Sequence, residues 1–133
     1  MTMLEGIRII DLSTVIFGPY ATQMLADLGA EVIKIESPAG DTPRYMGQFK
    51  NTPYMGGTHL TVNRGKKSAV LDLKKPEDAD VLRKLIETAD IFVHNIRARA
   101  IHKLGFGYED VKAMKPDIIY AHFARSEERR VGK

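Results

Sequence analysis

The chain has 133 residues, of which 44% are hydrophobic and 28% are charged, proportions that are ordinary for one globular domain with its own core. Its formal net charge of +3 comes mainly from residues 125–133; without them, 16 basic and 15 acidic side chains remain, which argues against a nucleic-acid-binding protein. The absence of cysteine excludes disulfides, thiolate zinc sites and a cysteine nucleophile. The apolar runs are far shorter than the roughly 20 residues of a membrane span, so we expect no binding to membranes. The lack of cysteine and of a secretory signal pattern before the first predicted strand favours a cytoplasmic protein.

The start of the chain predicts a strand, a helix and a second strand. Residues 6–11 (GIRIID) are rich in β-branched side chains, as a short buried strand is. Pro19 fits the first turn of a helix, and Gly29 fits its end. Residues 31–35 (EVIKI) then form the second strand, and a helix between two strands favours parallel pairing with a right-handed crossover.

From Glu36 to Leu60 the chain is rich in proline and glycine, which predicts a long irregular connection of a kind that is usually functional or mobile. Alternation of strands and helices resumes after it. We predict strands at 68–73, 91–93 and 118–121, and helices at 76–89, 100–104 and 108–114. The fold class is therefore α/β, with an open, mostly parallel, Rossmann-like sheet and flanking helices.

A basic loop precedes the third predicted strand. It contains Arg64, Lys66 and Lys67 around Gly65, and such side chains could bind phosphate groups. A solvated turn is the simpler alternative, because exposed charges are the norm. Neither a Gly-x-Gly-x-x-Gly motif nor a Walker motif is present, so the usual dinucleotide and P-loop fingerprints are missing.

The histidines do not predict a metal site. They stand at positions 59, 94, 102 and 122, without close ligand spacing and without a cysteine to assist them. His94 follows a predicted strand and could contact a ligand, although a structural role is the alternative.

Nine short segments occur in an order that is specific as a set, although each is weak alone. They are GIRIIDLS (6–13), GPYAT (18–22), LADLGAEVIKIE (25–36), GD (40–41), NRGKKS (63–68), LDLK (71–74), NIR (95–97), LGFGY (104–108) and PDIIY (116–120). The set resembles the family III CoA-transferases, which include formyl-CoA transferase, carnitine CoA-transferase and α-methylacyl-CoA racemase. This resemblance implies that residues 1–124 are a partial N-terminal domain of a larger, interlocked homodimer, so we expect its sheet to be incompletely covered by helices.

The resemblance implies an enzyme that acts on an acyl-CoA and a small carboxylic acid. In the family, an aspartate attacks the thioester to form a mixed anhydride, coenzyme A returns to give an aspartyl-CoA thioester, and an acceptor carboxylate completes the exchange. That aspartate lies beyond Phe123 in family members, so we expect no catalytic residue in this chain and no activity of the chain alone. A racemase-type enzyme, or a non-enzymatic nucleotide-binding module that uses the loop at 64–67, are the alternatives.

The resemblance also implies positions that bind coenzyme A along the pantetheine path. Val15 corresponds to a residue whose backbone contacts the coenzyme, and Asn95 and Ile96 match a pair that lines the pantetheine path. Ile16 replaces a glutamine and Ser37 replaces an arginine of some members, which weakens the likeness to the formyl-CoA enzymes.

Further positions are implied around the nucleotide. Lys66 matches a basic residue beside adenine and phosphate, and we expect its neighbours Arg64 and Lys67 to assist it. Lys103 stands where a basic residue reaches phosphate, and Leu104 where an apolar residue packs on adenine.

The C-terminal segment 125–133 (RSEERRVGK) departs from the family pattern. A common sequencing-library adapter can encode it, so we predict that this tail is not native. A natural, solvated basic tail is the alternative.

Overall fold

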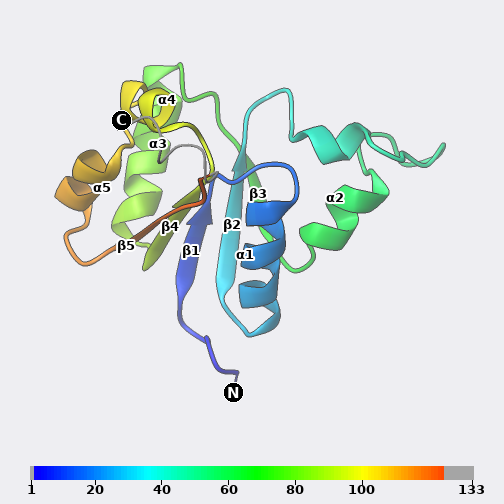
Figure 1. Ribbon diagram of the computed structural model, residues 1–133, viewed down its shortest axis with the longest axis horizontal. Coiled ribbons are helices and arrows are strands. Elements are labelled where there is room, and N and C mark those ends of the chain that lie inside the picture. Colours follow the sequence, from blue (N-terminus) through cyan, green and yellow to red (C-terminus); the bar gives the residue numbers. More distant parts are fainter. Residues whose placement is uncertain (1, 125–133) are drawn as a thin grey trace, which may run out of the picture.

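Five parallel strands form one sheet (Figure 1). They are β1 (Arg8–Asp11), β2 (Glu31–Glu36), β3 (Lys67–Val70), β4 (Ile91–His94) and β5 (Ile119–His122). Their order is β3-β2-β1-β4-β5, and all four pairings are parallel. The computed structural model describes residues 2–124. The predicted open, parallel, Rossmann-like α/β sheet is confirmed.

Helices cover both faces of the sheet. They are α1 (Phe17–Asp27), the 3₁₀ turn η1 (Thr42–Tyr45), α2 (Gly57–Val62), α3 (Pro76–Glu87), α4 (Ala98–Lys103) and α5 (Tyr108–Met114). The apolar sides of α3, α4 and α5 pack in one cluster on one face of the sheet. Helix α1 packs on the other face, and α2 lies beside α1 and η1 (Figure 1).

The central strands are buried on both sides. Ile9 and Ile10 point to opposite faces of β1 and are both 0% exposed, and Phe92 of β4 is also 0% exposed. The expectation of an incompletely covered sheet is therefore wrong for the central strands. It is right only at the sheet edges, where Val70 of β3 and Ile119 of β5 are 62% and 61% exposed.

Two sequence-based boundaries are corrected by the structure. The strand predicted at 68–73 ends at Val70, and Asp72 lies in the turn that leads into α3. The main-chain N–H of Asp72 donates to Asp78 at 2.8 Å, and its carboxylate accepts the N–H of Lys74 at 3.1 Å. These bonds turn the chain away from the sheet and so place Lys74 above the carboxyl end of β3.

The second correction concerns the connection from Glu36 to Leu60, which is partly regular because it contains η1 and the start of α2. Gly56 precedes α2 at a tight crossing of the chain. A Cβ atom there would lie 2.2 Å from the carbonyl oxygen of Pro43 and 2.3 Å from that of Met46. The glycine is therefore required by the packing of this segment, although in the sequence it is indistinguishable from an ordinary loop glycine.

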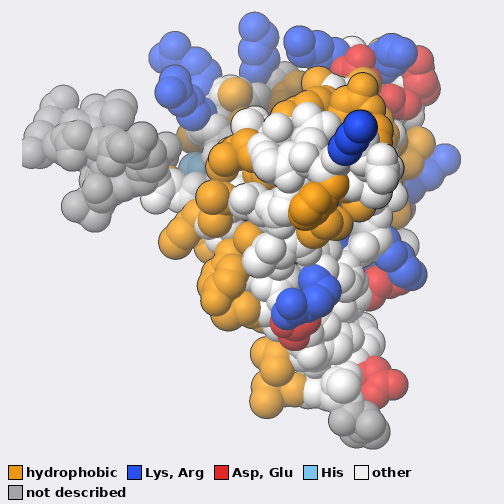
Figure 2. All heavy atoms as spheres, turned by 90° about the vertical axis from the view of Figure 1, so that its right-hand side faces the viewer, with side chains coloured by type: hydrophobic (Ala, Val, Ile, Leu, Met, Phe, Trp, Pro, Cys, Tyr) orange, Lys and Arg blue, Asp and Glu red, His pale blue; other side chains and the backbone are white. Residues whose placement is uncertain are grey.

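The connection carries an exposed apolar surface beside α2, on the face shown in Figure 2. Tyr45, Met46, Phe49 and Tyr54 are 46–58% exposed. Within residues 2–124, no helix combines the length and the apolar character that crossing a membrane requires. The tail at 125–133 lies outside the described residues.

Candidate functional site

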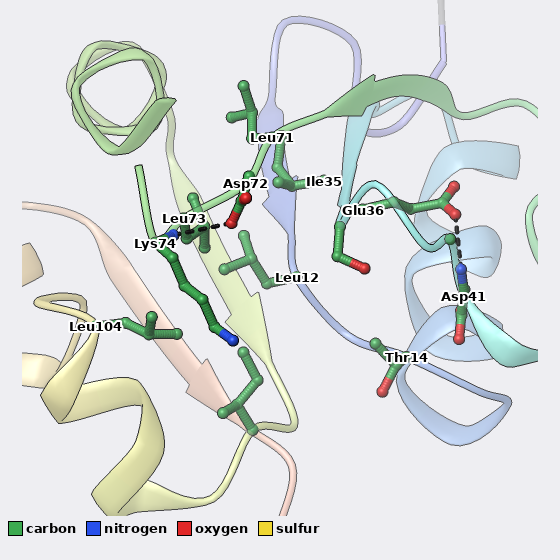
Figure 3. A pocket seen from close by; sticks show the side chains of 13 residues that line it. Leu12, Thr14, Ile35, Glu36, Asp41, Leu71, Asp72, Leu73, Lys74 and Leu104 are labelled. Atoms are coloured by element: carbon green, nitrogen blue, oxygen red, sulfur yellow. Dashed lines mark hydrogen bonds between the residues drawn. The ribbon is translucent and has the colours of Figure 1, made fainter. Parts of the chain in front are cut away.

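The direction of the chain across the sheet reverses between β1 and β4. From β1 it proceeds outward through β2 to β3, and then returns to β4 and β5 on the other side. Loops that leave the carboxyl ends of β1 and β4 therefore part at this point, where open α/β sheets bind ligands. A cleft of about 240 Å³ opens beside it (Figure 3). It is lined by Leu12, Thr14, Ile35, Glu36, Ser37, Gly40, Asp41, Leu71, Asp72, Leu73, Lys74, Ile96 and Leu104.

The cleft combines an apolar floor with a lysine. Leu12, Ile35 and Leu71 are buried beneath it, and the Lys74 side chain extends along it beside Leu104 (Figure 3). The structure gives the Lys74 ammonium no hydrogen bond to any residue from 2 to 124. A neighbouring recess shares Lys74 and Leu104 and adds Lys103. The arrangement suits a ligand with a flat apolar group and nearby negative charges.

The loop after β1 is clamped to the loop after β4. The side-chain oxygen of Asn95 accepts the Thr14 N–H at 3.0 Å, and its Nδ2 donates to the Thr14 carbonyl at 2.9 Å. The side-chain amide of Asn95 thus bonds both the N–H and the carbonyl of Thr14, in the way that the main chain of a neighbouring strand would. The two segments that bear Val15 and Ile96 are held in fixed relation by this contact.

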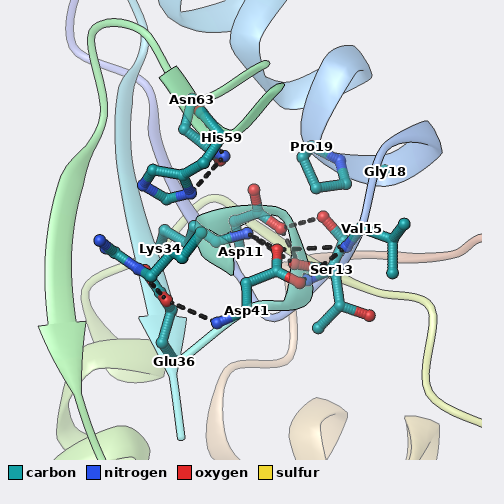
Figure 4. A network of polar contacts seen from close by, with 12 residues as sticks. Asp11, Ser13, Val15, Gly18, Pro19, Lys34, Glu36, Asp41, His59 and Asn63 are labelled. Carbon is teal, nitrogen blue, oxygen red and sulfur yellow. Dashed lines mark hydrogen bonds and ion pairs between the residues drawn. The ribbon is translucent and has the colours of Figure 1, made fainter. Parts of the chain in front are cut away.

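A buried ion pair supports the same loop from below (Figure 4). Lys34 Nζ and Asp41 Oδ2 lie 2.9 Å apart, and each side chain is only 2% exposed. Lys34 also donates to the Ser13 carbonyl at 3.0 Å. The Asp41 carboxylate accepts the Val15 N–H at 3.0 and 3.1 Å, and Val15 has the unusual φ of 69°.

Glu36 fixes the position of Asp41. Its carboxylate accepts the Asp41 N–H at 2.9 Å and two bonds from Arg44, each of 2.7 Å. Burial opposes ionisation, but the hydrogen bonds from Arg44 and from the Asp41 N–H prevail and lower the pKa of Glu36 to about 2. Glu36 is therefore an anion held by Arg44.

Among residues 2–124, no three acidic or histidine side chains converge to hold a metal ion.

Lys66 lies inside the protein. Its ammonium donates to Asp11 at 3.2 Å, to the Pro19 carbonyl at 2.9 Å and to Asn63 at 2.9 Å, and its side chain is 2% exposed. Burial lowers the pKa of Lys66, and the nearby Asp11 carboxylate opposes that change. All three N–H donors of the ammonium are thus used to join β1, α1 and the basic loop.

The other two cations of the basic loop lie at the opposite end of the sheet from the cleft. Arg64 pairs with Asp27, the last residue of α1, at 2.7 Å, and Lys67 pairs with Glu31, the first residue of β2, at 2.5 Å. The Arg64 and Lys67 side chains are 65% and 69% exposed. The loop at 64–67 and the cleft are therefore separate surfaces.

His94 supports the cleft from within the core. Its Nδ1 accepts the Ile96 N–H at 3.1 Å, and its Nε2 contacts the Tyr120 hydroxyl at 2.8 Å, which in turn donates to the Phe106 carbonyl at 2.9 Å. This chain of bonds requires a neutral His94 with its proton on Nε2. Burial, together with the stacked ring of His122, lowers the pKa of His94 to about 4.

The residues predicted from sequence thus fall into two groups: those around the cleft, and the basic-loop residues Arg64, Lys66 and Lys67, which do not line it. Val15, Asn95, Ile96, Lys103 and Leu104 all lie at the carboxyl end of the sheet, around the cleft. The cleft also brings in residues that sequence reasoning did not propose, namely Leu71, Lys74 and Asp41. Two of these belong to the segment LDLK, but only the turn after Val70 places them at the cleft.

The sequence of this chain is similar to those of CoA-transferases. The family model for CoA-transferase family III matches residues 4–125. A mouse succinyl-CoA:glutarate CoA-transferase is 45% identical over 90% of this chain and 28% of its own length. A succinyl-CoA:mesaconate CoA-transferase from Haloarcula hispanica is 39% identical over 100% of this chain and 34% of its own length.

Solved structures give the same result. A hypothetical protein from Mycobacterium tuberculosis has a TM-score of 0.85 and 35% identity, over 93% of this chain and 34% of its own. A CAIB/BAIF family protein from Brucella suis has a TM-score of 0.84 and 34% identity, over 91% of this chain and 33% of its own. The chain spans about a third of the length of these proteins. With its sequence and its fold both matched, the chain belongs to CoA-transferase family III.

Proposed function

We propose that this chain is the coenzyme-A-binding part of an acyl-CoA:carboxylate CoA-transferase. The observation that carries the proposal is the cleft beside the carboxyl ends of β1 and β4, where the direction of the chain across the sheet reverses. This cleft has an apolar floor, and the exposed cations Lys74 and Lys103 lie beside it. The names of the mouse and Haloarcula relatives support the same reaction class.

The proposed ligand lies along the carboxyl ends of the strands. Ile96 and Leu104 offer half-buried apolar surface for the adenine ring, and Lys74 and Lys103 provide cations for the phosphates. The pantetheine arm then passes Asn95 toward the loop after β1. The sequence-based assignment of phosphate contacts to Arg64, Lys66 and Lys67 remains a prediction, and the experiment below tests it at the two exposed cations, Arg64 and Lys67.

The nucleophile of the proposed reaction comes from outside this chain. Three buried carboxylates lie near the site, and each is paired with a cation: Asp11 with Lys66, Glu36 with Arg44, and Asp41 with Lys34. A carboxylate held in this way is a poor nucleophile, because its lone pairs already accept hydrogen bonds. An aspartate of a longer protein would attack the acyl-CoA carbonyl, form a mixed anhydride and expel the CoA thiolate. The thiolate would then attack the aspartyl carbonyl, which gives an aspartyl-CoA thioester and releases the original acyl group as a carboxylate.

The assembly proposed for the longer protein is an interlocked homodimer in the cytoplasm. The exposed apolar surface at Tyr45, Met46, Phe49 and Tyr54 supports burial against a further part of such an assembly.

Titration calorimetry with coenzyme A tests the binding proposal on the 133-residue chain. Each lost charge-assisted hydrogen bond is worth about 1.5–3 kcal/mol, so the double variant Lys74→Ala/Lys103→Ala should bind at least tenfold more weakly. The matched double variant Arg64→Ala/Lys67→Ala removes the same charge at the other end of the sheet and should bind within about threefold of the parent. The reverse ranking would assign the phosphates to the basic loop, and a parent chain with no affinity for coenzyme A would refute the proposal.

The reaction itself is tested on the longer protein. Incubation with an acyl-CoA followed by hydroxylamine should convert an aspartyl-CoA thioester to a hydroxamate that mass spectrometry locates on one aspartate. A racemase would instead exchange the α-proton of the acyl group with deuterated water and leave no hydroxamate.

A further inference from the structure

A second recess opens where α4 and α5 meet the ends of β4 and β5, and is called here the α4–α5 recess. Its volume of about 450 Å³ is within the range of sites for small ligands. Arg99 and His102 of α4, Tyr108 of α5 and His122 of β5 line it, over the buried His94. The described residues that line it include no aspartate or glutamate, so the recess offers cationic and neutral donors without a negative group.

Several of these donors are not used within the protein. The side chains of Arg99, His102 and Tyr108 are exposed, and the structure gives none of them a hydrogen bond or an ion pair to any residue from 2 to 124. The Nε2 atom of His122 differs, because it is buried and still has no hydrogen-bond partner among the described residues. Buried polar atoms are nearly always paired, so this nitrogen is available to bond a ligand in the recess.

The contacts of the stacked histidines assign the donor role to His122. The rings of His94 and His122 lie 4.3 Å apart between centroids, with 15° between their planes. Both nitrogens of His94 are used inside the protein: Nδ1 accepts the Ile96 N–H at 3.1 Å, and Nε2 contacts the Tyr120 hydroxyl at 2.8 Å. His94 therefore forms a wall of the recess, and His122 is the ring of this pair that has a nitrogen left for a ligand.

Helix α4 separates the α4–α5 recess from the coenzyme cleft. Ala100 and Lys103 line the recess beside the cleft, whereas Arg99 and His102 line the α4–α5 recess. Residues three apart share a face of a helix, so these two pairs belong to different faces of α4. The α4–α5 recess has no lining residue in common with the cleft or with the recess beside it.

We propose that the α4–α5 recess binds a small oxyanion, a carboxylate or a phosphate, at a site separate from the coenzyme cleft. Arg99 can bond two oxygens of such a group at once, and His102 and His122 can each donate a ring N–H. The Asp110 carboxylate of α5 accepts the Gly107 N–H at 3.2 Å and does not line the recess, so it does not occupy these donors. The inference does not depend on the proposed function, because none of these residues is assigned to coenzyme A.

NMR of the histidine rings of the 133-residue chain tests the proposal. The probes are sodium succinate and sodium phosphate, added at constant pH and at an ionic strength held constant with sodium chloride. The signals of His102 and His122 should shift saturably with at least one probe and give its Kd. His59, in α2 beside α1 and η1, is the remote reporter and should not shift.

Two arginine variants form a matched pair. Arg99→Gln removes the proposed two-oxygen contact, whereas Arg97→Gln removes the same charge from an exposed side chain that does not line the recess. We expect Arg99→Gln to bind the anion at least tenfold more weakly and Arg97→Gln to bind within about threefold of the parent. His122→Phe keeps an aromatic ring against His94 but has no N–H, and it should also bind at least tenfold more weakly. If His122→Phe does not fold, the arginine pair decides, because both arginines are exposed.

Preference for succinate would identify a carboxylate site and preference for phosphate a phosphate site, and each would support the proposal. Absence of a saturable shift with both probes, or equal weakening by the two arginine variants, would overturn it. Displacement of the bound anion by one equivalent of coenzyme A would overturn it too, because the recess would then belong to the coenzyme site. A parent chain that binds the anion but not coenzyme A would support this inference and count against the proposed function alone.

Discussion

The buried His94 should make this domain lose stability in mild acid. Burial lowers the pKa of His94 from the ordinary 6.5 to about 4, and the stacked His122 ring, whose centroid lies 4.3 Å from that of His94, contributes to the shift. In the unfolded chain His94 binds a proton near pH 6.5, whereas in the folded chain it does so only near pH 4. Between these values the unfolded state holds more protons, so a falling pH favours unfolding.

The expected magnitude follows from the same linkage. A tenfold change in proton affinity corresponds to about 1.4 kcal/mol, so the full effect of His94 is about 3 kcal/mol, and about 2 kcal/mol of it is lost between pH 7 and pH 5. Burial also lowers the pKa of His59, which adds to the loss with the same sign. Glu36 contributes below this window, because its pKa of about 2 affects stability only as the pH falls below about 4.5.

Urea unfolding followed by circular dichroism at pH 7, 6 and 5 measures this slope. The variant His94→Asn keeps an acceptor for the Ile96 N–H but cannot titrate, and it retains His59. It should be less stable at pH 7 and should lose about 2 kcal/mol less than the parent on going to pH 5. A parent chain whose stability falls no more steeply than that of the variant would show that His94 does not titrate as the structure requires.

Other expectations follow from the packing and the exposed surface. Lys66→Met should lower the free energy of unfolding by about 3–5 kcal/mol, because it leaves the buried Asp11 carboxylate unpaired. Lys67→Met removes one partner of an exposed ion pair and should lower it by less than about 1 kcal/mol. Urea titration measures both losses, and similar values would contradict this expectation. Gly56→Ala should lower the melting temperature by several degrees, because its Cβ would lie 2.2 Å from a carbonyl oxygen, and an unchanged transition would mean that the segment can relax. Size-exclusion chromatography should show self-association that Phe49→Ser/Tyr54→Ser reduces, and a parent that is monomeric at high concentration would contradict this. The chain alone should transfer no CoA between an acyl-CoA and an acid above a blank without enzyme, and any clear transfer would place the nucleophile within it.

The fold could be predicted well because its signals are local. The segment GIRIID and the helical spacing after Pro76 define a buried strand and a one-sided helix wherever they occur. The connection from 36 to 60 was harder. Gly56 and Gly57 stand at the start of α2, where glycine also marks a loop, and the close approach that requires Gly56 involves a carbonyl group 13 residues away, that of Pro43.

The candidate site also depends partly on local sequence signals and partly on contacts between distant parts of the chain. By itself, the sequence determined four of the five strand ends to within one residue, and the family likeness, because these depend on short stretches of chain; the end of β3 at Val70 was not among them. It could not separate the cations. Lys66, Lys67 and Lys74 are equally basic in the sequence, yet the structure buries the first against Asp11, pairs the second with Glu31 and leaves the third along the cleft. Only the tertiary structure decided these roles, because the partner that attracts or releases a charge comes from a distant part of the chain, and its distance sets the energy.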